Sequence, residues 1–328
     1  MLSTVHPSIS RQFSVFLEFL KRNEFGKKIS YSISLFVTGT LAILFFVLAL
    51  FNNYLAQDIQ RLRLRASPFP DFHMSQYPLL GTHAEPPISA TAAIIMDADS
   101  QVVVYQKNAD FRFSPASTTK IMTALVSLDQ YHPDDILTVT KTIDTEGSGL
   151  GLFTGEKLSY ESLLKAALIY SANDAAYTIA ENYPGGETAF VAAMNAKAQA
   201  LHLANTHFGD PDGLDDTENY TTARDLVRLS ALAMEKPLFA SIVHTKSATI
   251  ISSNSKNTYT FQNRNILLGF SGINGIKTGY TDEAGEVLAT SVQQNNHTFY
   301  IIVMKSKDRF LDTQTLLPLL TKIQYISL

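Results

Sequence analysis

The sequence predicts an α+β fold, with an antiparallel sheet flanked by helices, and one N-terminal transmembrane helix. Apolar and β-branched runs gather at both ends of residues 88–328, while helical periodicity fills the middle, which indicates the sheet and its helices. A long apolar stretch without charges lies nearer the N-terminus and indicates the transmembrane helix. At 328 residues, the chain is long enough for one large domain and an appendage.

The apolar stretch comes first in the chain. No residue between Lys28 and Asp58 carries a charge, and a stretch of this length can cross a hydrocarbon core of about 30 Å. A cleaved signal peptide is the rival interpretation, but no clear cleavage site follows the stretch. We therefore expect a cytoplasmic tail at residues 1–28 and an uncleaved anchor at residues 29–56. Basic residues just before the span place the rest of the chain outside the cytoplasm, in a single-pass arrangement at the cell membrane.

A linker and one large domain are expected after the span. Prolines are frequent in residues 57–87, which is typical of a semi-rigid extended linker. The domain at residues 88–328 begins with two apolar runs around a polar turn, as in a β-hairpin. Its expected elements are strands at 92–96 and 102–105, helices after 115 and at 160–170, 188–204 and 222–235, strands at 248–251, 286–292 and 298–304, and a last helix from about 310.

Composition excludes several classes of function. The chain has no cysteine, so thiol nucleophiles, disulfides and cysteine-ligated metals are excluded. Its formal net charge of -4 and the lack of a basic tract argue against a nucleic-acid partner. The acidic run at residues 210–216 lacks the spacing of a calcium loop, and we interpret it as a turn. Neither a metal nor a cofactor is expected.

The pattern Ser-x-x-Lys can place a hydroxyl nucleophile beside an amine base, but it occurs three times. Ser117 opens an apolar helix with Lys120 one turn further on the same face. Taken alone, Ser117 could equally be a helix N-cap. A lysine accepts the proton of a serine only when burial or a nearby cation lowers its pKa, and Lys277 could supply that cation. The other two matches fit structural roles, Ser162 with Lys165 inside a helix and Ser253 with Lys256 in a polar turn.

Two further short patterns complete a possible site. Ser171-Ala172-Asn173 follows an apolar helix, where the chain would turn and present a hydroxyl and an amide; an ordinary helix cap is the alternative. Lys277-Thr278-Gly279 does not fit a phosphate loop, because the preceding glycines have the wrong spacing. An edge strand explains it better, with the ammonium and hydroxyl binding a carboxylate and Gly279 allowing a ligand backbone to approach.

These three patterns, in this order, resemble the penicillin-binding serine D-alanyl-D-alanine carboxypeptidases of low molecular mass, which are related to the serine β-lactamases. The likeness extends from about residue 88 to the C-terminus. It is carried by the segments Ser114 to Leu125, Ser171 to Ala176, Asn205 to Phe208, Gly213 to Asp216, Thr222 to Asp225 and Gly275 to Gly285. The resemblance implies a β-lactamase/transpeptidase-like fold with an all-helical subdomain.

The resemblance also implies residue roles. Ser117 would be the acylated nucleophile, Lys120 its general base and Ser171 the relay that returns a proton to the leaving D-alanine. The remaining positions would bind substrate. Asn173 would bind the amide of the acyl donor, and Lys277 and Thr278, with Gly279 beside them, would bind the terminal carboxylate, for which Arg309 would be a second ligand. The N–H groups of Ser117 and Tyr280 would bind the oxyanion.

Two departures from the family pattern matter. Many relatives have glycine where Ala172 stands here, which would narrow the cleft without removing a functional group. The family usually reaches the membrane through a C-terminal amphipathic segment behind a second β-rich domain. Here the catalytic domain is expected to end at residue 328, and the membrane contact is expected from the N-terminal span instead.

The expected function is a membrane-anchored hydrolase that removes the terminal D-alanine from peptidoglycan stem peptides through an acyl-enzyme. β-Lactam antibiotics would be covalent inhibitors. A β-lactamase is a weaker alternative, because no Glu-x-x-Leu-Asn segment is present to activate a deacylating water. A DD-endopeptidase that cuts cross-links would use the same three patterns. An idle cell-wall-binding scaffold would keep the fold but lose patterns that are all intact here.

Overall fold

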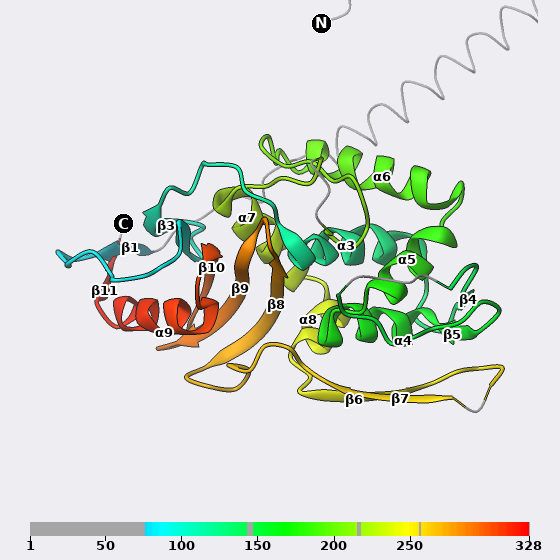
Figure 1. The fold of residues 1–328 in the computed structure, drawn as a ribbon. Helices are drawn as coiled ribbons and strands as arrows, with labels where there is room; N and C mark the ends of the chain where they lie inside the picture. Colours follow the sequence, from blue (N-terminus) through cyan, green and yellow to red (C-terminus); the bar gives the residue numbers. More distant parts are fainter. Residues whose placement is uncertain (1–75, 143–146, 215–217, 256, 328) are drawn as a thin grey trace, which may run out of the picture. The chain divides into compact units, whose positions relative to one another are not determined.

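The computed structural model describes residues 76–327, except 143–146, 215–217 and 256 (Figure 1). The expected tail at 1–28, the anchor at 29–56 and most of the linker at 57–87 lie outside the described residues. Within the described part, no helix is both long and apolar enough to cross a membrane.

A five-stranded antiparallel sheet organises the domain, in the order β3-β2-β10-β9-β8. Strands from opposite ends of the domain are neighbours in this sheet: β2, near the start of the domain, pairs antiparallel with β10, near its end. β8 is an edge strand of this sheet, as expected for the Lys-Thr-Gly segment. The strands are β2 (Ala92–Asp97), β3 (Val103–Lys107), β8 (Ile273–Thr281), β9 (Gly285–Gln294) and β10 (His297–Ser306).

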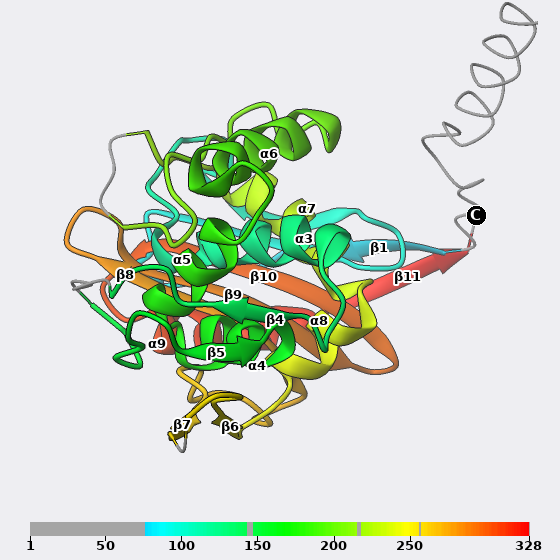
Figure 2. The same cartoon turned by 90° about the vertical axis from the view of Figure 1, so that its right-hand side faces the viewer.

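The two faces of the sheet bury different side chains against different helices. Along β2, Ile94 and Met96 face one core while Ala93 and Ile95 face the other, as the period of two in a strand requires. Helix α9 (Arg309–Leu320) covers one face and α7 (Ala223–Met234) covers the opposite face (Figures 1 and 2). The antiparallel sheet flanked by helices is therefore confirmed.

Further helices gather beyond β8 and form the helical region of the domain (Figure 1). The central helix of this region is α3, in which each residue from Lys120 to Ser127 is buried, so that this part of the helix is buried on every side. The elements are η2 (Ala116–Thr119), α3 (Lys120–Gln130), α4 (Tyr160–Lys165), η3 (Ala166–Tyr170), α5 (Asn173–Glu181), α6 (Gly186–Ala200) and α8 (Pro237–Val243).

The helical region is not all-helical, which corrects the sequence-based expectation. It also carries two small antiparallel sheets, made by β4 (Ile136–Thr138) with β5 (Lys157–Ser159) and by β6 (Ser247–Ile251) with β7 (Thr258–Gln262). Three of these four strands were not expected. They are short and mostly solvent-facing, so few of their residues show the apolar alternation that reveals a strand in sequence.

One strand begins before the boundary that the sequence suggests for the domain. β1 (Gln76–Leu80) lies inside the expected linker and pairs with β11 (Ile323–Ser327) near the C-terminus. Pro78 is compatible with this pairing because a two-stranded sheet has only edge strands, where a missing N–H is tolerated. The described residues thus include one strand inside the segment expected to be a linker.

Candidate active site

The first pattern lies where η2 meets α3, next to the edge strand β8. Ser117 sits in the single 3-10 turn of η2, and Lys120 is the first residue of α3. The turn brings the Lys120 Nζ to 3.1 Å from the Ser117 Oγ. The side chain of Ser117 does not cap the turn, so its hydroxyl is held by the lysine and not by a helix N-terminus.

Lys120 makes two more hydrogen bonds in the interior. Its Nζ donates to the Asn173 Oδ1 at 2.7 Å and to the backbone carbonyl of Asp212 at 2.7 Å. The side chain is 1% exposed. Burial lowers the pKa of Lys120, and the carboxylates of Asp212, Asp210 and Asp174 partly raise it again. Burial, one of the two causes expected from the sequence, is therefore the largest cause of the lowered pKa.

The second pattern begins where the helical chain reverses direction. Ser171 ends the π-helical turn η3 in a left-handed conformation, with φ of 69°. Helix α5 then starts at Asn173, whose N–H donates to the Ser148 carbonyl at 2.8 Å. This reversal turns the Ser171 hydroxyl toward β8 and the Asn173 amide toward Lys120. The sequence predicted that the chain would turn here but did not predict α5.

The third pattern faces the second across the site. On β8, the Lys277 Nζ donates to the Ser171 Oγ at 2.9 Å and to the Thr278 carbonyl at 2.9 Å. Lys277 is 1% exposed and Thr278 is also buried. Burial lowers the pKa of Lys277 well below its usual value, and the positive charges of Lys120, Arg309 and Arg264 lower it further. Two lysines of lowered pKa thus lie within one buried cluster.

Gly279 lets β8 approach the segment that carries Ser117. A Cβ added at Gly279 would lie 3.0 Å from the Ala116 Cβ and 3.1 Å from both the Pro115 carbonyl oxygen and the Ser117 N. No larger residue fits this contact without moving the strand or the turn. Tyr280 follows on β8, with its ring exposed and its hydroxyl donating to the Asp282 carboxylate at 2.9 Å.

Arg309 approaches the same strand from α9. Its Nη1 donates to the Gly279 carbonyl at 2.8 Å, and its guanidinium lies 4.0 Å from the Glu286 carboxylate. Burial lowers the pKa of Arg309 from its usual high value. The structure thus brings all nine predicted site residues to one place, around the end of β8 and the start of α3. Their chemical roles remain predictions.

The rejected Ser-x-x-Lys matches have structural contacts. The Ser159 Oγ accepts the Ser162 N–H at 3.2 Å and caps α4, while Lys165 forms a half-buried ion pair with Glu161. Ser253 lies at the tip of the β6–β7 hairpin, and its N–H donates to the Lys157 carbonyl at 2.7 Å. Lys256 lies outside the described residues. Neither of these serines approaches the cluster around Lys120.

Sequence reasoning missed two acidic residues beside the site. Asp174 accepts the N–H groups of residues 150, 151 and 152, at 2.9 to 3.0 Å, and so fixes a loop next to α5. Asp212 was interpreted only as part of a turn, yet its backbone carbonyl contacts Lys120. The position of Asp174 directly after Asn173 could have suggested that its carboxylate lies beside the site. The contact between the Asp212 carbonyl and Lys120 has no sequence signal, because every residue has a backbone carbonyl.

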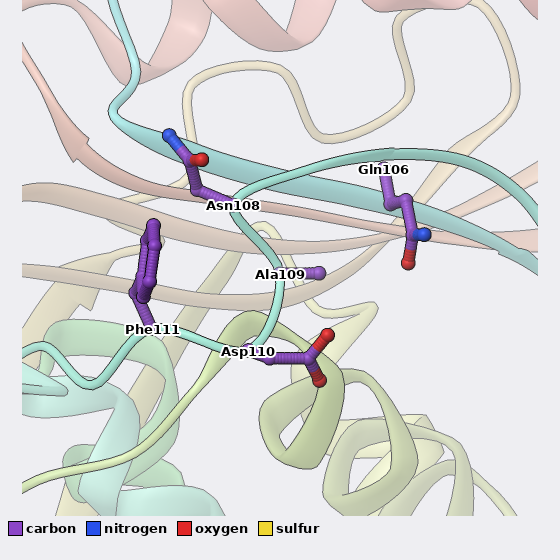
Figure 3. Close-up of a pocket in the computed structure, with 5 residues that line it drawn as sticks. All are labelled: Gln106, Asn108, Ala109, Asp110 and Phe111. Atoms are coloured by element: carbon purple, nitrogen blue, oxygen red, sulfur yellow. The ribbon is translucent and has the colours of Figure 1, made fainter.

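A separate hollow of about 370 Å³ lies beside the end of β3. Its lining residues are Gln106, Asn108, Ala109, Asp110 and Phe111 (Figure 3). Arg224 at the start of α7 donates to Gln106 and to the Asp110 carboxylate, so part of the polar lining is already paired. None of the predicted site residues lines this hollow.

A serine hydroxyl beside a buried lysine amine, at the edge of an antiparallel sheet flanked by helices, defines the class of penicillin-binding serine peptidases. The family model described as D-alanyl-D-alanine carboxypeptidase matches residues 81–308. The chain therefore belongs to the D-alanyl-D-alanine carboxypeptidase family of serine peptidases.

Individual relatives carry several activity names. A D-alanyl-D-alanine endopeptidase of Pseudomonas aeruginosa is 34% identical over 71% of this chain and 76% of its own length. A D-alanyl-D-alanine carboxypeptidase of a Streptomyces strain is 34% identical over 68% of this chain and 82% of its own length. The crystal structure of a Streptomyces DD-transpeptidase covers 73% of this chain and 98% of its own, with 31% identity and a TM-score of 0.68.

Proposed function

We propose that this chain is a D-alanyl-D-alanine carboxypeptidase that removes the terminal D-alanine of peptidoglycan stem peptides through an acyl-enzyme on Ser117. The observation that carries the proposal is the set of partners around the Lys120 Nζ. Two of its three partners, the Asn173 Oδ1 and the Asp212 carbonyl, can only accept hydrogen bonds. A neutral amine has two N–H donors and one lone pair, so the lone pair is left for the Ser117 hydroxyl.

In the acylation step, the Ser117 Oγ attacks the carbonyl carbon of the penultimate D-alanine, and its proton passes to the Lys120 Nζ. The N–H groups of Ser117 and Tyr280 stabilise the oxyanion. The C–N bond then breaks, and the leaving amine takes a proton from the Ser171 hydroxyl, which acts as a relay and regains the proton that Lys120 took from Ser117. Since Ser171 accepts its hydrogen bond from Lys277, its own O–H is free to donate. Water finally hydrolyses the ester and restores Ser117.

The terminal carboxylate of the substrate would bind at β8. Lys277, Thr278 and Arg309 bring an ammonium, a hydroxyl and a guanidinium to this strand, and the Arg309 contact with the Gly279 carbonyl holds the guanidinium beside it. The same groups would bind the carboxylate of a β-lactam antibiotic. Asn173 would present its amide to the backbone of the acyl donor while its Oδ1 stays on Lys120.

A second candidate is a DD-endopeptidase that cuts peptide cross-links. The endopeptidase name of the Pseudomonas aeruginosa relative favours it. The two reactions share the acyl-enzyme and differ only in the leaving group, which is free D-alanine in one case and a peptide-linked D-amino acid in the other.

We also propose that residues 29–56 anchor the domain to the cell membrane, with the catalytic domain on the extracytoplasmic side and residues 1–28 in the cytoplasm. The charge-free apolar stretch and the basic residues before it support this proposal. A chain that lacks residues 1–57 should then move from the membrane fraction to the soluble fraction.

Labelling with a fluorescent penicillin tests the acyl-enzyme. The wild-type chain should carry one adduct, which peptide mass mapping places on Ser117, and Ser117→Ala should carry none. Ser162→Ala is the matched control and should label like the wild type. An adduct on any other residue contradicts the proposal. Incubation with a stem pentapeptide and with a cross-linked dimer then decides between the two candidates, according to which one is cleaved faster.

A further inference from the structure

Asp212 has a buried side chain that no step of the proposed reaction uses. It is 0% exposed, and its Oδ1 accepts one N–H, from Leu214 at 3.2 Å. Its Oδ2 is buried and has no hydrogen-bond partner among the residues that the structure describes. An unpartnered carboxylate oxygen in the interior is costly and calls for a physical reason.

The neighbouring Asp210 makes more of the loop's hydrogen bonds than Asp212 does. Asp210 accepts the N–H groups of Asp212 and Gly213, and the side-chain amide of Asn219 at 2.6 Å. These contacts hold the turn closed. The two acidic residues therefore differ in their contacts, since Asp210 accepts three hydrogen bonds from the loop and the Asp212 Oδ1 accepts the Leu214 N–H.

The loop that contains Pro211, Asp212 and Gly213 packs directly against the segment that carries Ser117 and Lys120. The Thr123 hydroxyl donates to the Pro211 carbonyl at 2.5 Å, and Lys120 donates to the Asp212 carbonyl. Gly213, with φ of 82°, has no room for a side chain, because a Cβ would lie 1.9 Å from the Ala116 carbonyl oxygen. These contacts hold Asp212 in the interior, with its backbone carbonyl on the Lys120 Nζ.

We propose that Asp212 is a positioning residue whose buried carboxyl group serves as the electrostatic partner of Lys120 and sets how readily this lysine loses its proton. This inference rests on the proposed function, in which Lys120 must be neutral to activate Ser117. The charged groups around the pair are the carboxylates of Asp210 and Asp174 and the ammonium of Lys277.

The electrostatics of the pair agree with its geometry. Among the carboxylates that raise the pKa of Lys120 against burial, Asp212 is the strongest. Burial in turn raises the pKa of Asp212, and the positive charge of Lys120 opposes that increase, while the charge of Asp210 and a side-chain hydrogen bond with it raise this pKa further. Each group thus favours the charged form of the other, whereas burial disfavours the charged forms of both groups.

The pH dependence of acylation tests this role. Asp212→Asn keeps the size of the side chain and removes its charge, so Lys120 should lose its proton at lower pH. The midpoint of the acid limb of the acylation rate should move down by about one pH unit, as expected for the loss of a nearby opposite charge. Asp212→Ala should move it in the same direction. Asp225→Asn, at a buried aspartate whose carboxylate bonds to Asn205 and Thr206, is the matched control and should leave the midpoint unchanged.

The rate of Ser117 labelling by a fluorescent penicillin is measured with the full chain between about pH 5 and pH 10, and circular dichroism shows which variants fold. A purely structural role of Asp212 would lower the rate by the same factor at every pH. An unchanged midpoint in either folded variant would therefore overturn the inference. Failure of the proposed function is distinguishable, because the wild-type chain itself would then not be labelled on Ser117.

Discussion

Replacing Gly279 with alanine tests how closely β8 must approach the nucleophile. The added Cβ would stand 3.0 Å from the Ala116 Cβ and 3.1 Å from the Ser117 N. Ordinary carbon contacts lie at about 3.5 to 4.0 Å, so β8 and η2 must separate by about half an ångström. Overpacking of this kind costs about 1 to 3 kcal/mol of unfolding free energy.

The effect on catalysis should be larger than the effect on folding. A displacement of about 1 Å near the reacting atoms can lower the rate about a hundredfold, so a displacement of about half an ångström should lower the acylation rate about tenfold. The assay is the second-order rate of Ser117 acylation by a fluorescent penicillin, together with release of D-alanine from a stem pentapeptide. Gly81→Ala is the matched control, because nothing lies within 4 Å of its added Cβ. An acylation rate of Gly279→Ala within twofold of the wild type would refute the reasoning.

Four further predictions concern charged groups. Burial lowers the pKa of Lys120 to about 8, and the proposed base is the neutral amine, so acylation should level off above about pH 8. It should fall about tenfold per unit at lower pH, as a pH series of labelling rates would show. Lys120→Arg should abolish labelling at every accessible pH, because a guanidinium keeps its proton; retained labelling would assign the base role elsewhere. Lys277→Ala should lower kcat/KM for the pentapeptide about tenfold to a hundredfold through loss of a charged carboxylate ligand, and an unchanged value would place the carboxylate elsewhere. Asp312→Ala should lower the unfolding free energy in urea by about 3 kcal/mol, because Asp312 accepts the N–H groups of Ser89 and Ala90 in the interior. A loss below about 1 kcal/mol would contradict this estimate.

The pairing of Ser117 with Lys120 could be predicted because it is local. Three residues of helical geometry bring the two side chains together, whatever the rest of the chain does. The edge position of Lys277 could also be predicted, from the glycine that follows and the apolar strands that come after. Sequence patterns of this kind reflect short-range geometry, which a single segment determines by itself.

The contacts that complete the site could not be predicted in the same way. Sequence alone did not show that the Asn173 Oδ1 faces Lys120, because that orientation depends on the reversed conformation of Ser171. The contact between Lys120 and the Asp212 carbonyl uses a backbone atom, which every residue has. The pairing of β1 with β11 joins two short segments from opposite ends of the domain, and neither has a strong alternation of its own.

The hydrogen bonds of Lys120 also determine when the enzyme can first become active during folding. Its partners lie 3, 53 and 92 residues away in sequence, and the Lys277 partner Ser171 lies 106 residues away. Only the shortest of these contacts can form in an isolated helix, while the others require closure of long loops. A nascent or partly folded chain therefore holds Ser117 and Lys120 side by side without the surroundings that activate them. Penicillin labelling would then report completed assembly of the domain, and the appearance of label during refolding would mark its last step.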